Sequence, residues 1–225
     1  MKKHSVLKAA ALTAAAYTVS LRGRTKHPDL EILRRYRFAH RGYHDKPVVP
    51  ENSLPAFRRA IEHGWGAELG VHLMKDGTLA VIHDSSLLRT AGADVQIEDL
   101  TREELENYRL EGTDERIPLF DEVLALFENT TPLIIELKAA NGNHFALSKA
   151  VCERLDSYKG VFCIESFDPM VVADVRELRP GICRGQLAEN FLKDKGALDP
   201  VRSVLATGLI GNALAKPDFI AFKFE

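Results

Sequence analysis

The strongest constraint on the fold is an alternation of short apolar stretches with longer amphipathic ones, which begins at Tyr36. The amphipathic stretches repeat their apolar residues every three or four positions, as helices do. Strand-like runs are YRFAH, GAELGV, LAVIHD, PLIIELK, GVFCIES, GICRGQL and DFIAFKF, and helix-like stretches span residues 54–63, 119–128, 144–158, 169–178 and 201–214. This alternation predicts parallel strands joined by crossover helices, in a doubly wound sheet or a TIM-type (β/α)8 barrel.

The chain lacks the glycine-rich signatures of nucleotide-binding sheets. No Gly-x-Gly-x-x-Gly motif follows the first strand and no phosphate-loop lysine motif occurs, so a TIM-type barrel is favoured over a Rossmann sheet. Residues 84–118 are polar and interrupt the alternation, which predicts a small insertion after the second strand. The net charge of −2 gives no reason to expect a nucleic-acid partner.

The number of strands predicts an incomplete barrel. With LAVIHD counted as part of the second unit, six parallel strands are expected over residues 35–225, and DFIAFKF is the last. A closed barrel has eight strands and typically about 250 residues. The chain is therefore expected to be truncated after the sixth strand, as a fragment would be, and to present unpaired edges on strands one and six.

Residues 1–34 are expected to form a separate N-terminal segment. Its apolar run from Ala9 to Leu21 is short and rich in alanine for a membrane span, and Lys8 and Arg22 flank it. A signal peptide, a weak membrane anchor and an amphipathic surface helix all remain open. Membrane association through this segment is thus one expectation, and a cytoplasmic or a membrane-associated location stays undecided.

The cysteines point to a packed interior rather than to a metal site. Cys152, Cys163 and Cys183 are odd in number and have no metal-ligand spacing. One lies in a helix pattern and two lie in apolar strands, so all three are predicted to be reduced core residues.

Ionisable residues lie near the carboxyl ends of the predicted strands, where a barrel carries its active site. Two carboxylates with no cysteine suit Ca²⁺ or Mg²⁺ better than Zn²⁺. An arginine and a lysine can hold a phosphate, and two histidines can act as general acid and base. Each has a plainer reading, since a buried histidine is often a core residue and a Glu-x-Lys pair can be a structural ion pair. Taken together, these groups predict metal-dependent cleavage of a phosphodiester. The residues are His40, Arg41, Glu68, His83, Glu136 and Lys138.

The same residues lie in segments that closely resemble the glycerophosphodiester phosphodiesterase family. These segments are AHRG, PENSLPAFRRAIEHGWGAEL, KDGTLAVIHD, RIPLFDEVLALF, LIIELK and IESFDPMVVADVRELRP. The resemblance implies a TIM-type barrel with a small insertion after the second strand, and hydrolysis of a small-molecule glycerophosphodiester to an alcohol and glycerol 3-phosphate with Ca²⁺ or Mg²⁺.

By this resemblance each candidate residue has an expected role. His40 and His83 form the acid/base pair, Arg41 and Lys138 contact the substrate phosphate, and Glu68 and Glu136 hold the metal. Asn52 is expected to cap the helix that follows it.

One position departs from the family pattern. The family usually has Glu-x-Asp in the second strand, and here Gly70 stands in place of the aspartate. Residues two apart in a strand share a face, so Gly70 should face the metal without a ligand, and His72 shares that face. The substitution Gly70→Asp is therefore expected to tighten metal binding. Two alternatives remain for the function, an inactive degenerate or truncated member of the family and a phospholipase acting on lysophospholipid-type phosphodiesters.

Overall fold

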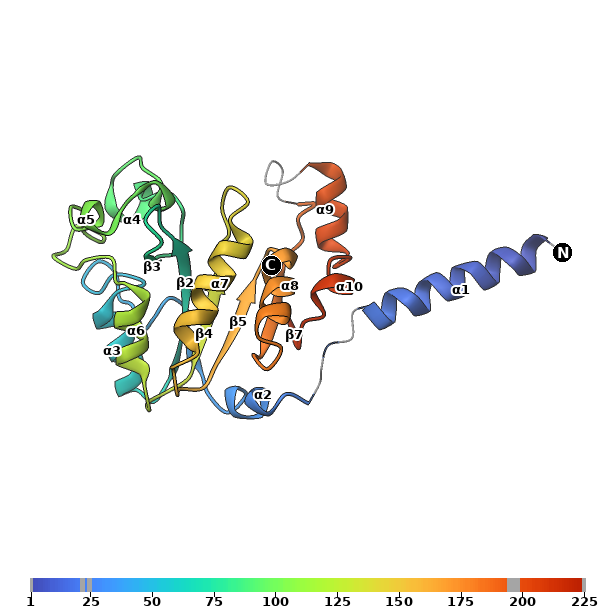
Figure 1. The fold of residues 1–225 in the computed structure, drawn as a ribbon, viewed down its shortest axis with the longest axis horizontal. Helices are drawn as coiled ribbons and strands as arrows, with labels where there is room; N and C mark the ends of the chain where they lie inside the picture. Colours follow the sequence, from blue (N-terminus) through green and yellow to red (C-terminus); the bar gives the residue numbers. More distant parts are fainter. Residues whose placement is uncertain (1, 21–22, 24–25, 194–198, 224–225) are drawn as a thin grey trace.

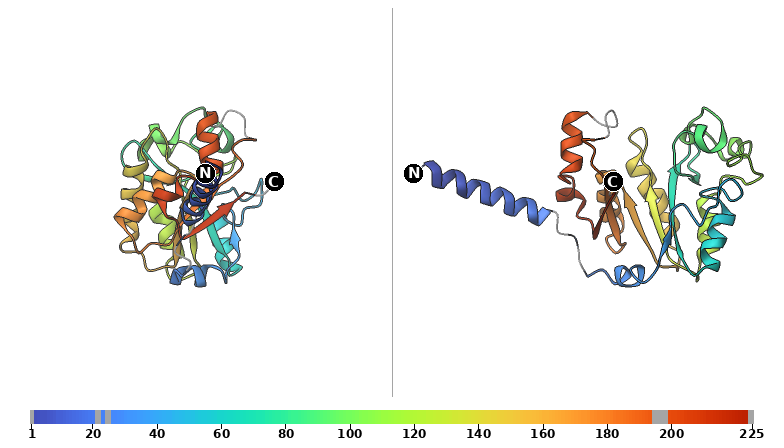
Figure 2. Two further views of the ribbon diagram at one scale, coloured as in Figure 1. Left: turned by 90° about the vertical axis from the view of Figure 1, so that its right-hand side faces the viewer. Right: turned by 180° about the vertical axis from the view of Figure 1, so that it is seen from behind.

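The computed structural model describes residues 2–20, 23, 26–193 and 199–223, and within them a sheet of seven strands forms a curled half-barrel (Figures 1 and 2). Six strands are parallel, as the sequence predicts, and one is antiparallel. The parallel strands follow in the order β1 (Phe38–Ala39), β2 (Gly66–Leu73), β4 (Leu133–Leu137), β5 (Phe162–Ser166), β6 (Arg184–Ala188) and β7 (Phe219–Phe222). Strands β1 and β7 are the edges, and no described strand joins them.

Helices cover the outer face of the half-barrel. They are α3 (Leu54–Glu62), α6 (Phe120–Phe127), α7 (His144–Leu155) and α8 (Pro169–Leu178). Alternate residues of β2 and β4, such as Leu69 and Ile135, are fully buried against aromatic residues of these helices, such as Phe57 and Phe120. The start of α8 is confirmed, because the Asp168 carboxylate accepts a hydrogen bond from the Met170 backbone N–H.

The expected capping role of Asn52 is wrong. The Oγ atom of Ser53 accepts the hydrogen bond from the Ala56 backbone N–H, so Ser53 is the N-cap of α3. Asn52 has a positive φ of 52°, and its buried side-chain amide has no hydrogen-bond partner among the described residues. The Asn52 side chain therefore does not cap the helix.

The insertion follows β3 (Leu79–Val81), which pairs antiparallel with β2. It contains α4 (Leu88–Ala91), a 3-10 helix (Ile97–Asp99) and α5 (Arg102–Leu105). These short elements enclose a small apolar cluster that includes Leu87, Ile97, Leu110 and Ile117. Figure 1 shows the insertion over the carboxyl end of β2.

The amino end of the half-barrel is closed by α2 (Pro28–Leu33), seen at the bottom of Figure 1. Leu30 and Leu33 of this helix pack with Cys163 and Cys183 in a cluster that also includes side chains from β1, β4 and β7. Residues from Pro28 onward thus contribute to the core, although the sequence places them in the separate N-terminal segment. All three cysteines are buried and free, as predicted.

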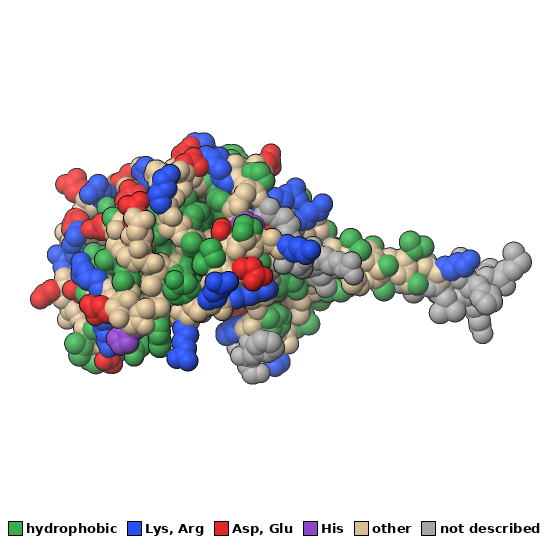
Figure 3. All heavy atoms as spheres, turned by 90° about the horizontal axis from the view of Figure 1, so that it is seen from below, with side chains coloured by type: hydrophobic (Ala, Val, Ile, Leu, Met, Phe, Trp, Pro, Cys, Tyr) green, Lys and Arg blue, Asp and Glu red, His purple; other side chains and the backbone are tan. Residues whose placement is uncertain are grey.

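Helix α1 (Lys2–Ser20) projects from the body of the domain (Figures 1–3). Leu12 and Val19 are exposed on it, and the Tyr17 hydroxyl donates a hydrogen bond to the Gly208 carbonyl at 2.8 Å. Among the described residues, no helix has the length and apolar character needed to cross a membrane.

The helix predicted over residues 201–214 is in fact two helices, α9 (Pro200–Thr207) and α10 (Asn212–Ala215). The backbone N–H of Gly208 bonds to the Val204 carbonyl and ends α9, and Leu209 then adopts a left-handed φ of 53°. An isolated left-handed residue interrupts the helical path, so the second helix starts afresh.

Candidate active site

Three neighbouring parallel strands bring carboxylates to the inner face, two of them at one level. Gly70 of β2 is in register with Glu136 of β4, and Glu136 is in register with Glu165 of β5. Glu68 precedes Gly70 by two residues and therefore shares its face. All three glutamates are buried. The inner face thus holds a row of acidic side chains near the carboxyl end of the sheet.

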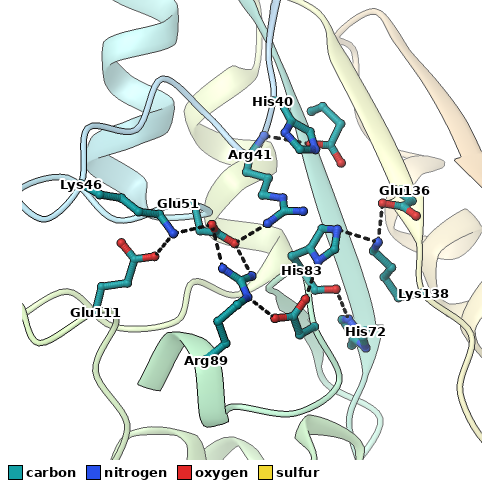
Figure 4. A network of polar contacts seen from close by, with 12 residues as sticks. His40, Arg41, Lys46, Glu51, His72, His83, Arg89, Glu111, Glu136 and Lys138 are labelled. Carbon is teal, nitrogen blue, oxygen red and sulfur yellow. Dashed lines mark hydrogen bonds and ion pairs between the residues drawn. The ribbon is translucent and has the colours of Figure 1, made fainter. Parts of the chain in front are cut away.

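His83 lies between the Asp84 carboxylate and the Lys138 ammonium group, close to Glu136 (Figure 4). Its Nδ1 atom is 2.6 Å from Oδ1 of Asp84, and its Nε2 atom is 3.2 Å from Nζ of Lys138. A lysine ammonium can only donate, so Nε2 is the acceptor and Nδ1 carries the hydrogen that Asp84 accepts. Lys138 also contacts Glu136, with 2.6 Å between Nζ and Oε2. The Glu-x-Lys pair is therefore an ion pair that also reaches the histidine.

The His83 ring is neutral at pH 7. Burial and the positive charge of Lys138 lower the pKa of His83 to about 4, and the hydrogen bond to Asp84 offsets only part of this effect. The Nε2 atom is therefore unprotonated near neutral pH and accepts the hydrogen bond from Lys138.

Arg41 is held by its backbone as well as by its side chain. With a positive φ of 57°, its backbone N–H donates to Oε2 of Glu68 at 2.8 Å. Gly42 follows in the same left-handed region, and a Cβ atom there would lie 2.9 Å from the Cβ of Ala56. The strained turn places the arginine next to the first carboxylate, and strain of this kind is concentrated at functional sites.

Glu51 organises the cations on this side of the site. It is 3% exposed, and it accepts hydrogen bonds from Arg41 (2.9 Å), Lys46 (2.8 Å) and Arg89 (2.6 Å), as Figure 4 shows. Burial opposes ionisation, but the hydrogen bonds from Arg89 and Lys46 hold the pKa of Glu51 well below its usual range. Glu51 therefore stays charged and fixes the Arg41 guanidinium.

His40 is the exposed member of the site, with 70% of its side chain accessible. Its Nε2 atom lies 3.8 Å from Oε2 of Glu68. Partial burial and the charge of Arg41 lower the pKa of His40. The ring therefore faces solvent at the edge of the acidic row.

The acidic row has the chemistry of a site for a hard cation. Burial and the neighbouring Glu136 raise the pKa of Glu68 to about 7, and burial and Glu68 raise the pKa of Glu165 to about 8. Buried carboxylates that repel one another gain from a divalent cation, and oxygen donors suit Ca²⁺ or Mg²⁺. In the described part of the chain, no three His, Cys, Asp or Glu side chains already converge on one point. These residues thus fit a divalent cation by the chemistry of their oxygen donors.

The geometry at Gly70 does not support the expected benefit of Gly70→Asp. A Cβ atom on Gly70 would lie 2.6 Å from the Ile82 carbonyl oxygen and 3.2 Å from Cε of Lys138. The Ile82 backbone N–H also donates to the Gly70 carbonyl at 3.0 Å. The chain leaving β3 therefore fills the space that an aspartate would need.

His72 does not replace the absent aspartate. Its Nδ1 atom is 2.7 Å from Oε1 of Glu98, in the insertion, and its Nε2 atom is 3.3 Å from the His83 carbonyl oxygen. Both ring nitrogens are thus engaged away from the acidic row, and the ring ties the insertion to the histidine loop.

Comparison with known proteins identifies the family. The model of the glycerophosphoryl diester phosphodiesterase family matches residues 40–211. The chain belongs to this family. It is 36% identical over 161 residues to a glycerophosphodiester phosphodiesterase of Caldanaerobacter subterraneus, covering 66% of this chain and 65% of that protein. Against a glycerophosphodiester phosphodiesterase of Bacillus altitudinis, the identity is 36% over 54% of this chain and 53% of the relative. The chain therefore spans between about half and two thirds of these two family members.

Solved structures show the same fold. A glycerophosphodiester phosphodiesterase from Thermotoga maritima aligns with a TM-score of 0.59 and 31% identity, over 82% of this chain and 72% of that one. A phosphodiesterase from Oleispira antarctica, in complex with the product sn-glycerol-3-phosphate, aligns with a TM-score of 0.64 and 22% identity, over 85% and 86% of the two chains. The family resemblance and the TIM-type fold class, with six parallel strands forming a half-barrel, are thus confirmed.

The structure brings all the residues predicted from the sequence into one polar region at the carboxyl end of the sheet (Figure 4). It also adds four residues that the sequence reasoning missed, and for three of them a signal existed. Asp84 directly follows His83, Glu51 stands in the Pro-Glu-Asn turn, and Glu165 ends an apolar strand just as Glu136 does. Arg89 lies in the insertion, and no feature of the sequence points to it.

Proposed function

We propose that the chain hydrolyses glycerophosphodiesters to an alcohol and glycerol 3-phosphate, with Ca²⁺ or Mg²⁺ as cofactor. The observation that carries this proposal is the position of the His83 ring, hydrogen-bonded to Asp84 and Lys138 beside the buried Glu136 carboxylate. The named relatives within the same family support the substrate class.

Glu68 and Glu136 would hold the metal ion, because both are buried oxygen donors on one face of the sheet. When bound, the ion supplies positive charge to a phosphoryl oxygen. Arg41 and Lys138 lie beside these two carboxylates and bind the substrate phosphate, which matches the planar guanidinium well. Glu51 keeps the Arg41 guanidinium in place through its buried hydrogen bond.

His83 is the general base in this proposal. Once Lys138 donates to the substrate phosphate in place of Nε2, the Nε2 lone pair accepts the proton of the attacking hydroxyl, and Asp84 stabilises the imidazolium through the hydrogen bond from Nδ1. His40 is the general acid in this proposal: its exposed ring takes up a proton from solvent and gives it to the leaving alkoxide, which departs as the alcohol.

The test is hydrolysis of glycerophosphocholine in the presence of Ca²⁺ or Mg²⁺, with glycerol 3-phosphate measured by an enzyme-coupled assay. His83→Ala should lower the rate by ~10²–10⁴, the range for loss of a positioned acid or base. The matched control is His144→Ala, which removes a histidine that pairs with Asp174 on the outer helices. Near-parental activity of His83→Ala would remove His83 from the mechanism. If the unmodified chain binds metal but turns over no substrate, it is an inactive member of the family.

A second candidate function is hydrolysis of lysophospholipid-type phosphodiesters. A pocket of about 630 Å³ lies at the carboxyl ends of β5 and β6, and its lining is mainly apolar. Phe167 directly follows β5, and its ring packs 6.1 Å from that of Phe191. An acyl chain would occupy this pocket while the phosphate is bound by Arg41 and Lys138. A human relative, 37% identical over 48% of this chain and 37% of its own length, is named lysophospholipase D.

The two substrates are distinguished by a variant in the pocket. Phe191→Ala should raise the KM for lysophosphatidylcholine about tenfold or more, because apolar contacts to the acyl chain are lost. The KM for glycerophosphocholine, which has no acyl chain, should stay unchanged. Equal effects on both substrates, or no turnover of lysophosphatidylcholine, would refute this second function.

A further inference from the structure

Glu165 is a buried carboxylate without a partner. It is 7% exposed, and no described residue forms a hydrogen bond or ion pair with its side chain. Its carboxylate oxygens are not among the fully enclosed side-chain atoms that lack a hydrogen-bond partner, so they are accessible at the inner face of the sheet. An unpaired acid whose oxygens are accessible there is available to a ligand.

The register places Glu165 in the acidic row. Gly70, Glu136, Glu165 and Gly185 are successive partners at one level across β2, β4, β5 and β6. The ring of Phe219 fills the space at Gly185, where a Cβ atom would lie 2.2 Å from the ring. The space at Gly70 is closed by the Ile82 carbonyl in the same way. Of these four positions, only the two middle ones leave room for a side chain, and both are glutamates, Glu136 and Glu165.

The carboxylates on the inner face outnumber the cations that pair with them. Three carboxylates, those of Glu68, Glu136 and Glu165, share the inner face, and Lys138 forms an ion pair with Glu136 alone. Arg41 reaches Glu68 through its backbone N–H, while its guanidinium is engaged by Glu51. A divalent cation would offset the repulsion between these carboxylates in their ionised forms.

We infer that Glu165 supplies the carboxylate that position 70 lacks, as a third protein ligand for the divalent cation held by Glu68 and Glu136. In this proposal the third carboxylate comes from β5 instead of β2, because the backbone next to position 165 leaves room for a side chain. Among the described residues, no three carboxylate, histidine or cysteine side chains already converge on one point. Binding of the cation therefore requires the glutamate side chains to change conformation. This inference rests on the metal dependence of the proposed function.

Calorimetric titration of the full chain with CaCl₂ and MgCl₂ tests the inference without any turnover. Glu165→Gln keeps the shape of the side chain and should weaken binding by at least ~10-fold, since even the loss of an outer contact costs roughly 10–100-fold. Glu165→Asp keeps the charge and should bind more tightly than Glu165→Gln. The matched control is Glu189→Gln, which removes a carboxylate that pairs with Lys223 after β6 and should leave affinity unchanged.

The outcomes separate the inference from the proposed function. If the parental chain binds Ca²⁺ and Glu165→Gln binds it equally well, Glu165 is no ligand although the metal site exists. If the parental chain binds neither ion at millimolar concentration, the metal dependence of the proposed function fails and the inference fails with it. If circular dichroism shows that Glu165→Gln does not fold, the metal affinities of Glu165→Asp and Glu165→Ala are compared instead. Equal affinities of these two variants would overturn the inference.

Discussion

Replacing Gly70 with alanine should destabilise the protein, against the usual trend for a glycine in a strand. Glycine weakens strand interiors, so its replacement would ordinarily be neutral or stabilising. Here the new Cβ atom would lie 2.6 Å from the Ile82 carbonyl oxygen, which is backbone and is fixed by the hydrogen bond from Ile82 N–H to the Gly70 carbonyl. Overpacking of this kind costs about 1–3 kcal/mol. In a chain of this size each kcal/mol lowers Tm by ~2–4 °C, so a decrease of roughly 2–12 °C is expected.

Thermal unfolding followed by circular dichroism measures this effect. Gly181→Ala is the matched control, because a Cβ atom there would meet nothing within 4 Å and φ is not positive. That control should be neutral or slightly stabilising, by up to about 1 kcal/mol. The steric argument is refuted if Gly70→Ala melts at or above the Tm of Gly181→Ala. It is also refuted if Gly70→Asp tightens Ca²⁺ binding with no loss of Tm.

Three further predictions follow from charge and topology. Because hydrogen bonds hold the pKa of Glu51 low, its stabilisation should be complete above about pH 4.5 and lost as pH falls further, so Glu51→Gln should flatten the acid side of a plot of stability against pH. Burial raises the pKa of Glu165 to about 8. Its contribution to the stability of the metal-free protein is therefore complete below about pH 4.5 and is lost as the pH rises towards 8. Tm measured in EDTA should fall over that pH range, and it should fall less steeply in the Glu165→Gln variant. The edges at β1 and β7 should make the chain self-associate, and sedimentation that shows only monomer at high concentration would count against this.

Much of the fold could be predicted because its signals are local. The period of apolar residues distinguishes strands from helices, and Asp168-Pro169 marks the start of α8 within a few residues. The break between α9 and α10 escaped prediction because it depends on the backbone conformation of Leu209, a residue type that rarely adopts a positive φ. The part played by α2 also escaped, since it depends on contacts with distant strands.

The site was predictable where a residue's type and its place at a strand end coincide. His83, Glu136 and Lys138 meet that condition, and the structure joins them in one chain of contacts. Glu165 meets it equally and was not predicted, because the family's second-strand pattern places the expected third carboxylate at position 70. The partners of Glu51 come from separate loops, so only the folded chain reveals that it collects three cations. The space at Gly70 likewise depends on where the chain leaving β3 runs.

The most direct test of the central claim is ³¹P NMR of glycerophosphocholine incubated with the full chain and Ca²⁺ or Mg²⁺. The phosphodiester signal should be replaced by that of glycerol 3-phosphate, and His83→Ala should leave the diester almost unchanged over the same time. Persistence of the diester with the parental chain and either metal, or release of phosphocholine in place of glycerol 3-phosphate, would contradict the account.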